Sequence, residues 1–110
     1  MQTLVQVVCA PGPSVRDAIA NDPRLEDRGF AVVVQKKPGR THGWLKLRSA
    51  SRAFSGVINV EWHDATHVLI CRVVNKRASK PYPITGAFVN YLLQRPRVLR
   101  RIQAINVIPR

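Results

Sequence analysis

Polar and hydrophobic residues alternate over several short stretches of this chain, a pattern typical of strands with one buried face. In residues 3–9, Val5, Val7 and Cys9 share one side, and Pro11-Gly12-Pro13 ends the stretch. Residues 30–36 are rich in β-branched valine, which favours strand geometry. The pattern predicts strands over 3–9 and 30–36.

A short helix is predicted between these two strands. Ser14 is followed three residues later by Asp17, a near match to the capping box that opens many helices. Val15, Ala18 and Ile19 then follow at helical spacing, and Pro23 favours an end near residue 21. The first third of the chain therefore resembles a β-α-β unit.

The middle of the chain predicts an antiparallel meander. A strand through Leu45 and Leu47 would bury both leucines and turn the alternating Trp44, Lys46 and Arg48 to the other face. Two more strands are predicted over 56–63 and 66–74, joined by a tight turn at Asp64-Ala65. That turn would set three cross-strand pairs, which are Trp62 with His67, Val60 with Leu69 and Ile58 with Cys71.

The C-terminal third changes to helical spacing. After the charged, proline-containing segment 76–83, apolar residues predict a helix that ends at Arg95-Pro96, and these are Ile84, Ala87, Phe88, Tyr91 and Leu92. Residues 98–108 fit either a helical turn followed by a strand or one continuous strand. The sequence leaves both readings open.

These elements fit one α+β domain in 110 residues, 45% of them hydrophobic. The predicted architecture is a mostly antiparallel sheet of about five or six strands, with helices on one face and the other face open. Cys9 and Cys71 lie in apolar runs, so we expect buried reduced thiols, with one disulfide as the alternative. No apolar run has the length of a membrane helix and no signal peptide is evident, so a cytoplasmic location is expected.

Charge is distributed unevenly along the chain. Residues 1–28 hold three basic and four acidic side chains, whereas 29–110 hold fifteen basic and two acidic ones, and the formal net charge is +12. Such a field attracts polyanions, among which nucleic acid is the first candidate. A solvated basic surface that keeps a small domain in solution is the plainer alternative.

Three groups of residues are candidates for nucleic-acid binding. Two basic loops would hold phosphates, and Trp44 beside Lys46 and Arg48 would be a stacking platform if its ring is exposed, or a core residue if it is not. A third group, near the C-terminus, would extend the track. The phosphate-binding candidates are Lys36, Lys37, Arg40, Lys76, Arg77 and Lys80, with Arg97, Arg100 and Arg101 turned towards solvent as the extension.

Catalytic readings have less support in the sequence. His63 and His67 have the spacing of a zinc-protease helix, but the β-branched residues around them favour strands. A small basic ribonuclease would need a proton-transfer group, for which His42 with Arg40 or His63 with Glu61 are the candidates. No cofactor or metal site is predicted.

The sequence thus predicts noncatalytic binding of nucleic acid, with RNA preferred to duplex DNA because no recognition helix of the usual kind is evident. An interaction module that docks an acidic protein or an anionic surface is the alternative. Sequence specificity and oligomeric state stay open.

Overall fold

The computed structural model describes residues 2–35, 39, 43–75 and 82–109. In this part of the chain the elements follow in the order β1 (Gln2–Cys9), α1 (Val15–Ala20), the 3₁₀ turn η1 (Glu26–Arg28), β2 (Phe30–Val34), β3 (Trp44–Ser49), β4 (Val57–His63), β5 (Val68–Val74), α2 (Tyr82–Gln94), α3 (Pro96–Leu99) and β6 (Ile102–Pro109). The reading of a helical turn followed by a strand is therefore the one adopted after Arg95.

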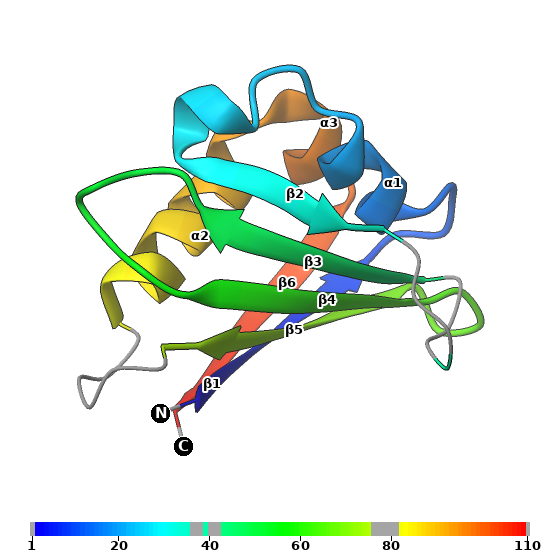
Figure 1. Cartoon of the computed structure of the whole chain (residues 1–110). Helices are drawn as coiled ribbons and strands as arrows, with labels where there is room; N and C mark the ends of the chain where they lie inside the picture. Colours follow the sequence, from blue (N-terminus) through cyan, green and yellow to red (C-terminus); the bar gives the residue numbers. More distant parts are fainter. Residues whose placement is uncertain (1, 36–38, 40–42, 76–81, 110) are drawn as a thin grey trace.

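All six strands form one sheet in the order β2-β3-β4-β5-β1-β6, and every neighbouring pair is antiparallel. The helices lie on one face of this sheet (Figure 1). The predicted α+β class, the antiparallel sheet and the packing of the C-terminal helix are confirmed. None of the helices in the described ranges is long and apolar enough to cross a membrane.

The N-terminal β-α-β unit differs from its simplest form. β1, α1 and β2 follow one another along the chain and the two strands run in the same direction, but β3, β4 and β5 lie between them in the sheet. The β3-β4-β5 meander occupies the position that a neighbouring parallel strand would take.

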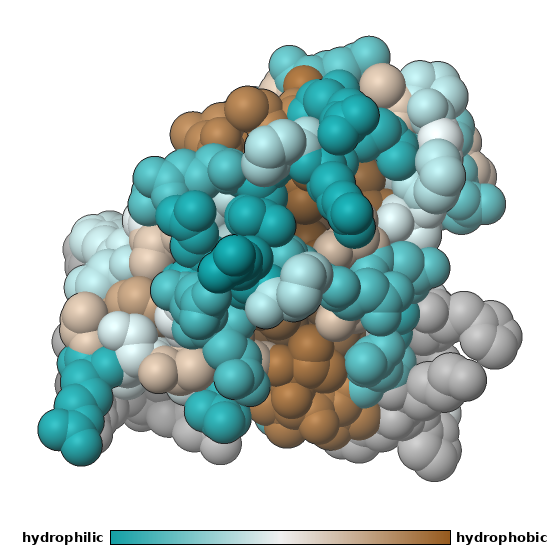
Figure 2. Space-filling model, turned by 90° about the horizontal axis from the view of Figure 1, so that it is seen from above, coloured by the Kyte–Doolittle hydropathy of each residue, from teal (hydrophilic) through white to brown (hydrophobic). Residues whose placement is uncertain are grey.

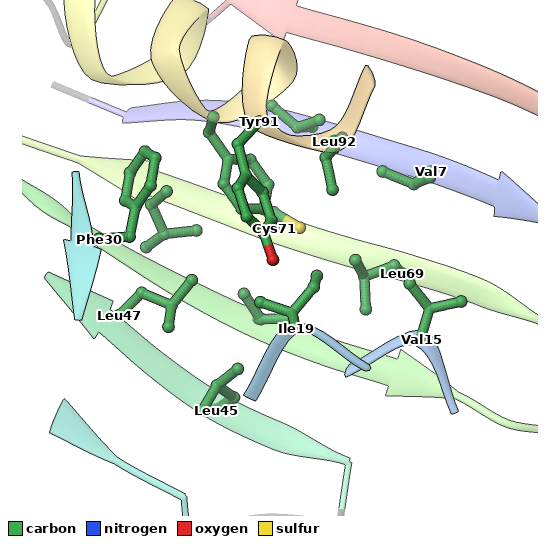
Figure 3. Close-up of a cluster of buried hydrophobic side chains, with 14 of the residues drawn as sticks. Val7, Val15, Ile19, Phe30, Leu45, Leu47, Leu69, Cys71, Tyr91 and Leu92 are labelled. Carbon is green, nitrogen blue, oxygen red and sulfur yellow. The ribbon is translucent and has the colours of Figure 1, made fainter. Parts of the chain in front are cut away.

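The core fills the layer between the sheet and the helices. From the sheet, Leu47 and Leu69 point towards Ile19 of α1 and Tyr91 of α2, as Figure 3 shows. These four side chains are at most 1% exposed. Phe30 contacts three rings, those of Phe54, Phe88 and Tyr91, at centroid distances of 5.3, 5.7 and 6.2 Å.

The two cysteines are free and buried, as expected. Cys9 is 4% exposed on β1 and Cys71 is fully buried on β5. Burial raises the pKa of both thiols, because an apolar environment disfavours the thiolate. Both side chains act as small hydrophobic residues of the core.

The predicted register of the β4-β5 hairpin is wrong by two residues. Trp62 pairs with Leu69, Val60 with Cys71 and Ile58 with Val73. The turn is longer than Asp64-Ala65, since His63 pairs with Val68 and four residues connect them. His67, in this turn, has a φ of 56°, the left-handed conformation. A shift of two keeps each residue on its predicted face, so the buried set is unchanged.

Candidate nucleic-acid interface

The face of the sheet opposite the helices carries polar and basic side chains interspersed with apolar ones such as Val57, Ile70 and Val74. The pairing of strands aligns Lys46 of β3 with Asn59 of β4 and Arg72 of β5. The same row continues to Leu4 of β1 and Ile108 of β6. Figure 1 draws no helix over this side of the sheet for the described residues. This row crosses five strands on the side of the sheet away from the helices.

Three cations lie on this open face. Arg48 and Arg72 are exposed and Lys46 is half-buried. The guanidinium of Arg48 donates from Nη1 to the carbonyl oxygen of Ser49 at 3.1 Å. Glu61 is the one acidic residue on this face within the described strands. The local balance of charge is positive.

The prediction that Trp44 is a stacking platform required an exposed ring, and the ring is buried. The side chain is 2% exposed, so neither face of the ring is open to a base. The residue begins β3 beside Gly43, where a Cβ atom would come within 2.4 Å of the carbonyl oxygen of Trp62. The two strands approach closely here, and the Trp44 ring is buried although it does not belong to the core cluster between the sheet and the helices.

Arg16 organises the same end of the sheet, and sequence reasoning missed it. Arg16 is 8% exposed, and its Nη2 donates to two carbonyl oxygens, those of Gln35 at 2.8 Å and Trp44 at 3.0 Å. Nη1 donates to the Asp17 carboxylate at 2.7 Å. Arg16 thus joins the end of β2 to the start of β3 and fixes where the intervening segment leaves the sheet. The only sequence signal is an arginine between Val15 and the apolar positions of α1.

Of the three C-terminal arginines, Arg101 has a structural role, which corrects its predicted place towards solvent. It donates to the Ala10 carbonyl oxygen at 2.9 Å and to that of Pro13 at 2.7 Å. Arg97 and Arg100 are exposed, but they lie on and just after α3, on the helical side of the sheet. The structure therefore does not join these residues to the open-face cations.

The two basic loops fall outside the described residues, which applies to Lys36, Lys37, Arg40, Lys76, Arg77 and Lys80. Their anchor points are described. At one end of the sheet, Val34 at the end of β2 pairs with Lys46 near the start of β3. At the other end, Val57 pairs with Arg48 near the end of β3 and with Val74 at the end of β5. The chain therefore leaves the sheet after Gln35 at one end and after Asn75 at the other.

No family model matches this chain, and neither curated proteins nor solved structures give a significant match.

The helical side presents a different electrostatic environment. Seen from above, its surface is mostly hydrophilic with separate apolar patches (Figure 2). A pocket of about 310 Å³ on this side is lined by acids and arginines together, including Asp17, Asp22, Arg95 and Arg97. Asp22 accepts hydrogen bonds from Arg95 at 2.8 Å and from the Tyr91 hydroxyl at 2.7 Å. Acidic and basic groups are mixed around this pocket, whereas the described strands of the open face carry three cations and one acid.

The histidines give little support to a catalytic reading. His63 is exposed and its Nε2 lies 3.8 Å from a carboxylate oxygen of Glu61. His67 packs at the β4-β5 turn, with its ring centroid 6.2 Å from that of Trp62. Neither contact forms a pair within hydrogen-bonding distance that would activate a nucleophile.

Proposed function

We propose that this protein binds nucleic acid without catalysis, through the open face of its sheet, and that single-stranded RNA is the preferred ligand. The observation that carries the proposal is the local charge of this face, where Lys46, Arg48 and Arg72 are opposed by Glu61 alone within the described strands. Phosphate contacts supply most of the affinity of such complexes.

The segregation of acidic residues supports the choice of face. Four of the six acidic side chains fall between residues 17 and 27, on the helical side. Three of these four pair with arginines there, namely Asp17 with Arg16, Asp22 with Arg95 and Asp27 with Arg24. Acidic side chains are therefore concentrated on the helical side, and Glu61 is the one acid on the described strands of the open face.

The direction of the proposed track follows β3. Lys46 and Arg48 lie two residues apart on one face of this strand, and six residues at about 3.3 Å each give a length of about 20 Å. The segment before β3 contains Lys36, Lys37 and Arg40. The segment that begins at Lys76 follows β5, which ends at the same end of the sheet as β3. We propose that the strand cations hold the centre of a phosphate backbone and that the loop cations hold its flanks.

The absence of a helix over this face, as far as the described residues show, favours a single strand over a duplex. α3 has four residues, too few to read a major groove, and the described open face carries amides such as Asn59 and Gln6 that can contact ribose hydroxyls or base edges. Because Trp44 is buried, binding gains little from stacking on this ring and should tolerate many sequences.

The test is a salt series with the purified, nuclease-treated protein, fluorescent single-stranded RNA and a duplex DNA of equal length. We expect tighter binding to the RNA, and a log–log slope of affinity against salt between about −2, for the three face cations, and about −6, if the six loop cations also engage. An unlabelled acidic polypeptide serves as competitor. Absence of RNA binding at low salt, with retention of the acidic polypeptide, would refute the proposal in favour of a protein partner.

We further propose a cytoplasmic location. Cys9 and Cys71 are free thiols on separate strands of the core, an arrangement common in reducing compartments.

A further inference from the structure

The two edges of the sheet are built differently. β2 forms one edge with only five residues, and its pairing with β3 is interrupted between Val32 and Val34. Arg16 donates to Gln35 just after this strand. Short length, an irregular register and a covering side chain are features that prevent an edge strand from pairing with another chain.

β6 forms the other edge and has few of these features. It runs for eight residues, Ile102–Pro109, and none of them is charged. Among the described residues, β1 is its sole strand neighbour. In antiparallel pairing, alternate residues direct their backbone groups to one neighbour, so half of the backbone donors and acceptors of β6 face away from β1. Pro109 removes a donor only at the last position.

Apolar side chains are exposed on both sides of this strand. Val107 pairs with Val5 and lies on the helical side, yet it is 44% exposed. Ile108 pairs with Leu4 on the open side and is 41% exposed. β6 is uncharged, has apolar residues on both faces, and pairs on its outer side with no other described strand, so it is suited to accept another strand.

We infer that β6 pairs with β6 of a second copy of this chain, which joins two sheets into one. A two-fold axis perpendicular to the sheet, through Asn106, places like faces opposite each other. Ile105 then lies opposite Val107 of the second copy, and Ala104 lies opposite Ile108. Apolar residues meet on both faces, and the two Asn106 amides meet at the axis.

The lack of charge on β6 favours a second copy of the chain as its binding partner, although the net charge of the protein is +12. Within Ile102–Pro109 neither copy contributes a charged side chain, so no like charges stand directly opposite each other. An acidic peptide would gain nothing from an uncharged strand. Standard interfaces bury about 800 Å² per partner, and one strand pair buries less, so the dimer is weak and forms at micromolar or higher concentration.

Dimerisation would extend the open face without covering it. Both helical layers stay on one side of the joined sheet, and both sets of Lys46, Arg48 and Arg72 stay on the other. The inference does not depend on the proposed binding of nucleic acid, and its test uses protein free of nucleic acid.

Sedimentation equilibrium over a wide concentration range tests the inference, with two lysine variants of matched exposure. Val107→Lys places a charge on β6, and Val33→Lys makes the same change on β2, where the valine is also 44% exposed. We expect the wild-type mass to rise from 12.4 kDa towards twice that value. Val107→Lys should weaken the dimer at least tenfold, whereas Val33→Lys should match the wild type. A monomeric wild type, or equal effects of both variants, would overturn the inference.

A cysteine variant tests the register. Directly opposed antiparallel residues lie about 4.5–5.5 Å apart at Cα, within the range that a disulfide spans. Asn106→Cys should therefore form a covalent dimer on mild oxidation, whereas Val33→Cys should not. Equal cross-linking of the two variants would contradict pairing through β6.

Discussion

At the scale of single residues, Arg16 carries the most consequential contacts of the helical side. Its buried guanidinium satisfies the carbonyl oxygens of Gln35 and Trp44 and holds β2 and β3 together where the segment after Gln35 begins. A planar fork reaches both acceptors at once, which an ammonium group on a flexible chain does less well.

We predict that Arg16→Leu lowers the free energy of unfolding by about 2–4 kcal/mol, because both carbonyl oxygens lose a charged donor in a buried position. Urea unfolding followed by tryptophan fluorescence measures the change. Arg24→Leu is the control, because the Arg24 side chain is 67% exposed and should cost no more than about 0.5 kcal/mol. Equal losses for the two variants would show that Arg16 is not a structural clamp.

Individual side chains were harder to predict than their strands. The alternation of polar and apolar residues correctly predicted that Leu45 and Leu47 are buried and that Lys46 and Arg48 share the other face. The burial of Trp44 and the role of Arg101 depend on segments distant in the sequence, since the carbonyl partner of Arg101 is Ala10, in the first strand-turn segment. A periodic pattern carries no information about such contacts.

At the scale of elements, Asp22 connects the end of α1 to α2 and the segment after it. The carboxylate is 6% exposed and accepts hydrogen bonds from the Arg24 backbone N–H, the Tyr91 hydroxyl and Arg95. Burial acts to raise the pKa of Asp22, but these donors and the charge of Arg95 outweigh it and lower the pKa below its usual value. Burial and the adjacent carboxylate raise the pKa of Tyr91, which stays protonated as the donor.

We predict that Asp22→Asn destabilises the fold by about 1–3 kcal/mol near neutral pH, because the charge-assisted hydrogen bonds weaken. Since the folded-state pKa is depressed, this stabilisation is present above the usual carboxyl pKa and is lost as the pH falls through the folded-state value. Chemical unfolding at about pH 7 and about pH 3 should show the difference between wild type and variant shrinking at the lower pH.

Asp27→Asn is the control for this pH dependence. Its side chain is 65% exposed, and its ion pair with Arg24 lies on the surface, so we expect less than about 0.5 kcal/mol at either pH. A difference for Asp22→Asn that stays constant from neutral to acid pH would contradict the role of its charge.

The sequence predicted the bounds of the elements closely, but it predicted the pairing of the strands less well. The helix predicted from Ile84 to Arg95 is observed as Tyr82–Gln94, because four buried apolar residues recur at helical spacing. The hairpin register failed because it depended on turn length, and a left-handed His67 permits a four-residue connection that composition does not reveal. The order of strands in the sheet could not be predicted. β1 and β2 are joined by a helix, as two neighbouring parallel strands would also be.

At the scale of the whole molecule, the two faces of the sheet have separate roles. The helical face carries the core and four of the six acidic residues, three of which pair with arginines. The open face carries uncompensated cations on β3 and β5. If β6 joins two copies, the two open faces form one surface, and binding of a long polyanion should become cooperative in protein concentration.

The most direct test of the central claim compares two charge-reversed variants for binding to single-stranded RNA at fixed salt. One variant combines Lys46→Glu, Arg48→Glu and Arg72→Glu on the open face. The other combines Arg24→Glu, Arg97→Glu and Arg100→Glu on the helical side, so the net charge changes equally. We predict a loss of affinity of at least tenfold, and a shallower salt dependence, for the open-face variant relative to the helical-side variant. Equal losses would mean that net charge alone draws the RNA, and would contradict an open-face site.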